Sequence, residues 1–390
     1  MKKNIIKVSL ILSGVLLGSS CGDFLDINQD PNNATDASVE QLLAASQLSM
    51  GSVLGGQHID GSGSINEDPS IFIQHYYNLN QSRYDISPSD YDANWRDLFR
   101  EGLKDIEEII TKGTADQLWT HVAIAQIQKA YIFTTFVDLW GEVPYTQALQ
   151  GQNNLSPEFD EGENVYDAAL LLLDEAIVNL NKTALAPQND IYFDGNAESW
   201  LRLANSLKLN LYTKIRLVNP DRSKAAIEAL IADDKLLTSS EMDWQFLYGA
   251  KASPENRHPL FIENYVACCN QFPSAYMIYT LNDQNDPRLP YYFYRQSLDD
   301  PEDTDIPCDA INCSPYPNNG YYGRGYFSRV QGDDSGLPND GTIRTTFGVY
   351  PAGGLYDLVE LDGEGDPITT RTVSISSNSG AGVQSFLTYF

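Results

Sequence analysis

The sequence predicts a mainly α-helical protein, in which a tetratricopeptide-like scaffold of helical hairpins is followed by a long, irregular, loop-rich portion. From about residue 36 to about 235, apolar residues recur every three or four positions, the period of an amphipathic helix. From about residue 240 to 390 this period is lost and turn residues dominate, as in SPYPNNGYYG at 314–323. The chain after residue 20 is long enough for one large domain or two ordinary ones, and we interpret 21–390 as a single domain.

The first twenty residues have the layout of an export signal. Three early lysines are followed by the short apolar stretch Val8–Leu17 and then by small residues up to Cys21. That stretch is too short to cross a bilayer as a helix. The residues LGSS before Cys21 resemble the lipobox of bacterial lipoproteins, although the aliphatic residue stands one position further out than usual. We therefore predict a lipoprotein signal peptide over 1–20 and fatty acylation, such as palmitate, at Cys21; a soluble secreted protein is the alternative.

Two helices are expected within residues 94–140. The first carries an apolar stripe made of Trp95, Leu98, Phe99, Leu103, Ile106 and Ile110. Gly113 is expected to end it and Thr114 to cap the second helix. The apolar positions of the second helix are Leu118, Val122, Ala125, Phe133 and Phe136. Gly141 should end this second helix, and Pro144 prevents it from resuming.

Three further helices are expected before residue 235. Asn164 should open one that reaches Leu180, Asn196 should cap one that closes at Asn219-Pro220, and Ser223 should start a shorter one. Amphipathic helices joined by short turns are typical of stacked helical hairpins, the arrangement of tetratricopeptide repeats. The full tetratricopeptide consensus is absent, so the prediction of stacked hairpins rests on the periodic spacing of apolar residues alone.

The charge and the motifs argue against several functions. The formal net charge is -28, which disfavours nucleic acid and anionic lipid heads but suits neutral ligands, cations or a basic partner. The sequence has neither a G-x-S-x-G nucleophile elbow nor a phosphate-binding G-x-x-x-x-G-K-[ST] loop. We predict no enzyme activity and no cofactor. A secreted glycosidase stays open as a minor alternative, because its two carboxylates can come from distant segments.

No metal site is predicted either. The four histidines are scattered without H-E-x-x-H spacing, and no C-x2-C pair suggests zinc. The segment from Asp26 to Asp30 resembles the start of a calcium loop, but Pro31 replaces the required glycine and Ala37 the closing glutamate.

Four cysteines remain if Cys21 carries lipid. An even number in an exported chain suggests disulfides, for which three pairings are possible. Neighbouring cysteines rarely bond to each other, so we favour bridges from Cys268 and Cys269 to Cys308 and Cys313. Four unpaired thiols are the alternative.

Tyrosines gather in the expected loops. We predict that ligand binding involves the tyrosines just ahead of the Trp95 helix and two later ones: Tyr76, Tyr77, Tyr84, Tyr91, Tyr276 and Tyr279. An exposed aromatic face with a few polar neighbours suits a sugar ring or a peptide. The alternative for each of them is packing in the core.

Five stretches, in this order, resemble the SusD/RagB family. They are CGDFLDINQDP at 21–31, GEVPYTQAL at 141–149, VYD leading to LDEAI within 165–177, WL followed by ANSLKL within 200–209, and DPRL at 286–289. The second stretch matches the family signature G-[DE]-[VI]-P-Y-x-x-A-L. The resemblance covers essentially the whole chain and is closest to the branch of nutrient-binding outer membrane lipoproteins.

The resemblance implies a tetratricopeptide-like scaffold whose irregular portion faces the ligand. It also implies a lipid anchor in the outer membrane, exposure at the cell surface and a SusC-like TonB-dependent transporter as partner. Such a protein binds oligosaccharides, or in some members peptides, and hands them to the transporter without catalysis. The ligand residues of the family vary, so none is transferred to this chain. A helical-repeat adaptor that binds another protein, with no small ligand, is the alternative function.

The sequence departs from the family at its end. The stretch SFLTYF at 385–390 resembles the family segment that leads into a further helix, and here the sequence stops. We therefore expect that the C-terminal helices of the scaffold are missing and that the sequence is a fragment or a truncated product.

Overall fold

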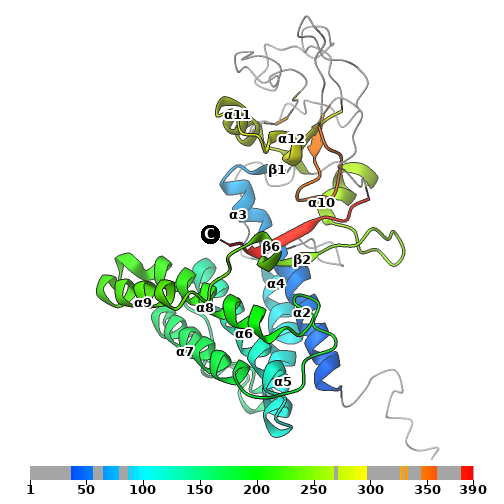
Figure 1. Ribbon diagram of the computed structural model, residues 1–390. Coiled ribbons are helices and arrows are strands. Elements are labelled where there is room, and N and C mark those ends of the chain that lie inside the picture. The colour runs from blue at the N-terminus through cyan, green and yellow to red at the C-terminus, as the bar shows by residue number, and fades with distance from the viewer. Residues whose placement is uncertain are drawn as a thin grey trace, which may run out of the picture.

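The computed structural model describes residues 37–55, 65–78, 87, 89–267, 271–296, 326, 328–329, 331–332, 344–357 and 379–389. A bundle of helices forms one part of the molecule, and a smaller part of short helices and strands stands at one end of it (Figure 1). The bundle contains α2 (Val39–Gly55), α4 (Asp92–Asp97), the π-helix η1 (Leu98–Leu103), α5 (Lys104–Ala115), α6 (Trp119–Trp140), η2 (Gly151–Asn153), α7 (Gly162–Leu180), α8 (Ala197–Lys214), η3 (Ile215–Leu217), α9 (Pro220–Asp233) and η4 (Ser240–Met242).

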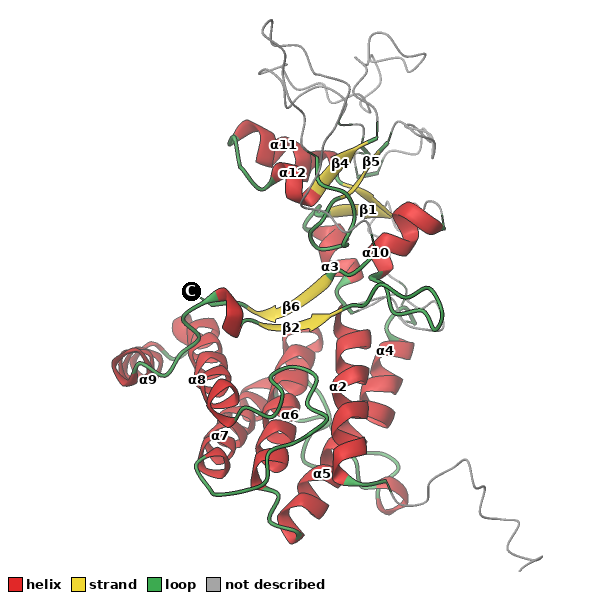
Figure 2. Ribbon diagram, turned by 45° about the vertical axis from the view of Figure 1, so that its right-hand side comes forward, coloured by secondary structure: helices red, strands yellow, loops and turns green. Residues whose placement is uncertain are grey.

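The smaller part is built from short elements. They are α3 (Glu67–Phe72), β1 (Tyr76–Asn78), α10 (Pro259–Phe261), η5 (Ile262–Val266), β3 (Gln271–Pro273), α11 (Ala275–Asp283), α12 (Leu289–Tyr292), β4 (Phe293–Arg295) and β5 (Thr345–Phe347). Strands β1 and β3 pair antiparallel, as do β4 and β5. A third antiparallel ribbon, β2 (Trp244–Leu247) with β6 (Val383–Leu387), lies across the end of the bundle that faces the smaller part (Figure 2).

Helix α6 is the centre of the bundle. Fourteen of its 22 residues are buried, because α2, α5, α7 and α8 all pack against it. Its last turns carry Phe133 and Phe136, which contact the Phe99 ring of η1, Phe133 edge to face and Phe136 stacked. The Trp95 ring of α4 also stacks on Phe136, with the ring centroids 5.4 Å apart. Rings in such contact contribute about 0.5–1.5 kcal/mol beyond the apolar area that they bury.

The structure confirms the mainly helical fold and one predicted cap. The Asn196 side chain accepts hydrogen bonds from the backbone N–H groups of Glu198 (3.0 Å) and Ser199 (3.1 Å) at the start of α8. The other predicted starts were wrong by a few residues. Helix α7 begins at Gly162 rather than Asn164. Helix α9 begins at Pro220 rather than Ser223, because proline is well suited to the first turn of a helix.

The predicted break at Gly113 was wrong. The helix continues through Thr114 to Ala115, so Thr114 is not a cap, and α6 starts after Leu118. Gly113 instead permits close packing, because an added Cβ would lie 2.8 Å from Cγ2 of Val122. The residue thus serves the contact between α5 and α6 and does not terminate a helix.

The stretch 141–149 forms a fixed turn after α6. Gly141 adopts φ +79°, and Val143 exchanges backbone hydrogen bonds with Asp160 at 3.2 and 2.9 Å. The Asp160 carboxylate also accepts the N–H groups of Tyr145 and Thr146, at 2.8 and 2.9 Å. Partial burial works against ionisation of Asp160, but these N–H donors outweigh it and hold the pKa of Asp160 below its usual range. The stretch therefore has a structural role.

The smaller part has its own core. It is formed by Phe261, Ile278, Leu281, Leu289, Phe293, Tyr326, Phe347 and Ala352. An ion pair is buried beside it, with 2.6 Å between Nε of Arg295 and Oδ2 of Asp357. In the described ranges, no helix has both the length and the apolar character needed to cross a membrane.

Candidate ligand-binding site

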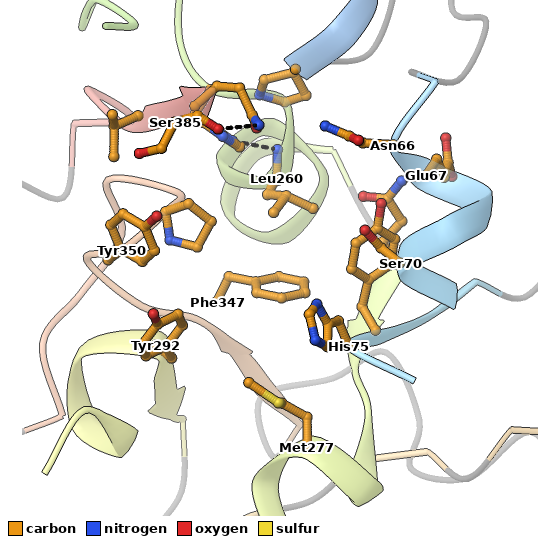
Figure 3. A pocket seen from close by; sticks show the side chains of 18 of the residues that line it. Asn66, Glu67, Ser70, His75, Leu260, Met277, Tyr292, Phe347, Tyr350 and Ser385 are labelled. Atoms are coloured by element: carbon orange, nitrogen blue, oxygen red, sulfur yellow. Dashed lines mark hydrogen bonds between the residues drawn. The ribbon is translucent and has the colours of Figure 1, made fainter. Parts of the chain in front are cut away.

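A cavity of about 510 Å³ lies between the smaller part and the end of the bundle. It is bounded by α2, α3, β1, β3, α10, α11, α12, the β4–β5 ribbon and β6 (Figure 3). Its size is within the usual range of small-molecule sites. The described residues that line it are Gly55, Asn66, Glu67, Ser70, His75, Tyr76, His258, Pro259, Leu260, Gln271, Met277, Arg288, Tyr292, Phe293, Phe347, Tyr350, Pro351, Val383, Gln384 and Ser385.

Aromatic rings form much of the wall. Pairing of β4 with β5 places Phe293 opposite Phe347, and the Phe347 ring meets that of Tyr76 edge to face at 6.1 Å. The Tyr292 and Tyr350 rings also meet edge to face, at 5.1 Å. Figure 3 shows Phe347 projecting between these two tyrosines and His75. Several ring faces and edges are thus presented around one space.

Polar groups from α3 and β3 form another wall. Nε2 of Gln271 donates to Oε1 of Glu67 at 2.8 Å, and both residues are buried. Nδ2 of Asn66 donates to the carbonyl of Leu54 at 2.6 Å, which ties the start of α3 to the end of α2. Burial, and after it the charge of Glu67, raises the pKa of Tyr76 well above its usual range. Tyr76 therefore stays a neutral phenol that can donate a hydrogen bond.

Both lining histidines have a pKa below the ordinary value. Burial alone lowers the pKa of His75, and it lowers the pKa of His258 to about 3. Nδ1 of His258 accepts the backbone N–H of Leu260 at 3.1 Å and so caps α10. The His258 ring is therefore neutral at pH 7.

Arg288 is already engaged at the edge of the cavity. Its guanidinium donates to both carboxylate oxygens of Asp286, with Nε 2.9 Å from Oδ1 and Nη2 2.6 Å from Oδ2. These hydrogen bonds lower the pKa of Asp286 to about 2. The described lining is thus suited to stacking and neutral hydrogen bonding. No group of His, Cys, Asp and Glu that could hold a metal occurs in the described part of the chain.

The predicted ligand residues are spread over the molecule. Tyr76 lines the cavity. Tyr77, the next residue, is buried with its ring 6.2 Å from that of Phe272. Tyr91 packs on Trp140 of the bundle at 5.8 Å. On α11, Tyr276 is 54% exposed, and neither it nor Tyr279 lines the cavity. Tyr84 and all five cysteines, Cys21, Cys268, Cys269, Cys308 and Cys313, lie outside the described residues. Ligand contact by the six tyrosines stays a prediction.

Four tyrosine and phenylalanine rings of the cavity were missed as ligand candidates: Tyr292, Phe293, Phe347 and Tyr350. Tyr292 follows the DPRL stretch at 286–289, so its position after that family segment was a usable signal. Phe347 and Tyr350 had no local signal, because only the pairing of β4 with β5 brings them to the cavity.

Comparison with known proteins identifies the scaffold. A family model called SusD-like, described as "Starch-binding associating with outer membrane", matches residues 31–306. The chain belongs to the SusD-like family. The description is that of a binding family associated with the outer membrane, and the predicted SusD/RagB resemblance is confirmed. No curated protein matches the sequence of this SusD-like protein.

Solved structures share its fold. A SusD/RagB family protein from Bacteroides thetaiotaomicron is 22% identical, with a TM-score of 0.56 over 66% of this chain and 54% of that one. A chitin-binding protein is 20% identical, with a TM-score of 0.63 over 80% of this chain and 64% of that one. A chitin-binding SusD homolog from Flavobacterium johnsoniae is 18% identical, with a TM-score of 0.58 over 80% and 60%. The SusD-like chain thus spans between half and two thirds of the length of these structures.

Proposed function

We propose that this SusD-like protein captures an oligosaccharide nutrient in the cavity around Phe347 and passes it to a SusC-like TonB-dependent transporter. The capture site would be held at the cell surface by lipid on Cys21, in the outer leaflet of the outer membrane. The family description and the two similar structures named as chitin-binding support a carbohydrate ligand. A peptide is the second ligand class that such a site could take.

The observation that carries the proposal is the set of rings around one cavity. Phe347, Tyr76, Tyr292 and Tyr350 come from three separate segments and meet around about 510 Å³. Sugar rings stack on aromatic faces through their C–H groups, while their hydroxyls need nearby donors and acceptors. Asn66, Ser70, Gln384 and Ser385 line the same space and can supply them.

Calorimetry with chitotetraose, maltotetraose and cellotetraose tests the capture step. We expect saturable binding of at least one tetrasaccharide, weakened by Tyr292→Ala and by Tyr350→Ala. The matched control is Tyr389→Ala, which removes an exposed ring outside the cavity. Tyr276→Ala tests the predicted ligand contact on α11, and a loss in that variant alone would move the site there. An absence of binding across the glycans and across a peptide panel would overturn capture and favour the adaptor function.

Anchoring and delivery need separate tests. Metabolic labelling with palmitate should mark the native protein and fail after Cys21→Ala. Protease added to intact cells should remove the anchored protein if it faces outward, and complete resistance would contradict surface exposure. Co-purification from detergent-solubilised outer membranes should recover a TonB-dependent transporter, and its absence would contradict the delivery step.

A further inference from the structure

A second hollow, of about 390 Å³, opens on the helical bundle and shares no lining residue with the cavity. We call it the α6–α9 groove. It forms where α6 ends, α7 begins and η3 leads into α9. Its described lining residues are Val137, Gly141, Glu142, Glu161, Gly162, Glu163, Tyr166, Asp167, Ile215, Val218, Asn219 and Arg222.

The groove presents apolar surface to solvent. Val137 and Ile215 are half-buried in it, and Val218 at its edge is 82% exposed. Covering such surface gains roughly 25 cal/mol for each Å² removed from water. Tyr166, the aromatic residue in the described lining, is buried, and its hydroxyl donates to Asp138. The groove therefore offers no open ring face for a sugar.

Carboxylates surround this apolar surface. Glu142, Glu161 and Glu163 are exposed, and in the described ranges none of the three forms an ion pair. Arg222, the basic residue in the described lining, is paired within the groove, since its Nη1 lies 2.6 Å from Oδ1 of Asp167. The hydrogen bond to Asp167 raises the pKa of Arg222. The field left at the rim is negative.

Helix stability explains only part of this charge. Glu161 and Glu163 stand at the N-terminus of α7, where a carboxylate interacts favourably with the helix dipole. Glu142 follows Gly141, the C-cap of α6, at the helix end where the dipole favours a cation instead. Glu142 thus has the charge that the helix dipole disfavours, and it lies beside exposed apolar surface. This combination points to a ligand with basic groups in the groove.

We propose that the α6–α9 groove docks a basic segment of a partner protein, with one apolar side chain in the hollow and flanking lysine or arginine side chains on Glu142, Glu161 and Glu163. The overall charge of -28 would guide such a segment toward the protein. The apolar lining of the groove would then hold the apolar side chain and so fix the position of the docked segment. This docking is independent of the oligosaccharide capture proposed above.

Fluorescence anisotropy tests the docking with the full chain. The probes are labelled, amidated pentapeptides in which one Leu, Ile, Phe or Trp stands between two pairs of lysines or arginines. Peptides with glutamates in place of the basic residues are the negative probes. Two variants address the groove, Val218→Ser and Glu142→Gln combined with Glu163→Gln. Their matched controls are Leu217→Ser, 83% exposed but outside the lining, and Glu198→Gln combined with Glu228→Gln.

We expect saturable binding of at least one basic peptide, weakened at higher salt, and no binding of the acidic peptides. Each groove variant should lower the affinity about three- to tenfold, since one contact of about 0.7–1.4 kcal/mol has that effect. The controls should stay within about twofold of the wild type. If the groove variants and the control variants lose affinity equally, binding is due to general charge attraction, and the proposal is overturned. An absence of saturable binding across the basic peptides would also overturn it.

Discussion

The ring of Phe347 meets the ring of Tyr76 edge to face, at 6.1 Å and 88°, although the two residues come from opposite ends of the sequence. Strand β1 supplies Tyr76 and strand β5 supplies Phe347, and neither strand exceeds three residues. Both residues line the candidate ligand cavity. It also gives the most direct test of how that cavity would hold a ligand.

Replacing Tyr76 should separate stacking from hydrogen bonding. Tyr76→Ala removes a ring worth roughly 1 kcal/mol in aromatic contact, so we expect about a fivefold weaker affinity for the bound glycan. Tyr76→Phe keeps the ring and should retain most of the affinity. Isothermal titration with the best tetrasaccharide measures both. A larger loss in Tyr76→Phe than in Tyr76→Ala would contradict the stacking role.

Gly113→Ala should destabilise the bundle although alanine favours helices. The added Cβ would stand 2.8 Å from Cγ2 of Val122, and such overpacking costs about 1–3 kcal/mol. The gain in helix propensity, about 1 kcal/mol, offsets only part of this cost. Urea denaturation should show a lower midpoint.

Gly102→Ala is the matched control for this substitution. Its Cβ would lie 3.6 Å from Oγ of Ser49, which is ordinary contact, so its midpoint should be unchanged or higher. If Gly113→Ala matches or exceeds the wild-type midpoint, α5 and α6 are not packed as closely as described.

His258 should make stability depend on pH. Its folded pKa, about 3, is below the ordinary value of 6.5 because the ring is buried. Between pH 6.5 and 3 the unfolded chain therefore binds a proton that the folded chain excludes, and stability falls as the pH is lowered through this window. His258→Asn keeps a side-chain acceptor for the N–H of Leu260 and should flatten that part of the profile. Urea midpoints at pH 7, 6, 5 and 4 measure the difference, and parallel profiles would rule out a titrating His258.

Breaking the Arg295–Asp357 pair should loosen the smaller part of the molecule. Both side chains are at most 1% exposed, and removing one partner of a buried pair typically costs about 3–5 kcal/mol. We expect Asp357→Asn to increase hydrogen exchange in β4, β5 and α12, with the bundle helices unchanged. The exposed pair Arg222–Asp167 supplies the control, and Asp167→Asn should have an effect below about 1 kcal/mol. Unchanged exchange in β4 and β5 after Asp357→Asn would contradict a structural role for the pair.

Periodicity was informative where a helix buries one continuous stripe. Leu98, Leu103 and Ile106 of the first expected stripe, and Val122, Phe133 and Phe136 of the second, were expected to be apolar contacts, and all six are buried. Boundaries were less predictable. A glycine such as Gly113 is a common helix terminator, but here it allows α5 to pack closely against Val122 of α6. The local sequence does not reveal that contact.

The candidate site was much harder to anticipate than the scaffold. Tyr76 and Tyr77 are neighbours on one short strand, where successive side chains point to opposite faces. Tyr76 therefore meets Phe347 at the cavity, while Tyr77 packs inward on Phe272. Both tyrosines were ligand candidates from the sequence alone. Only the segments packed on the two faces of β1 show that Tyr76 faces the cavity and Tyr77 does not.

The sequence by itself determined the helical scaffold and the SusD-like family, because apolar spacing and the ordered motifs are local properties of the chain. The tertiary structure decided which rings share a cavity and which apolar and acidic residues meet in the α6–α9 groove. Those juxtapositions depend on contacts between segments far apart in the sequence, and short strands and loops have no periodic signal that would reveal them.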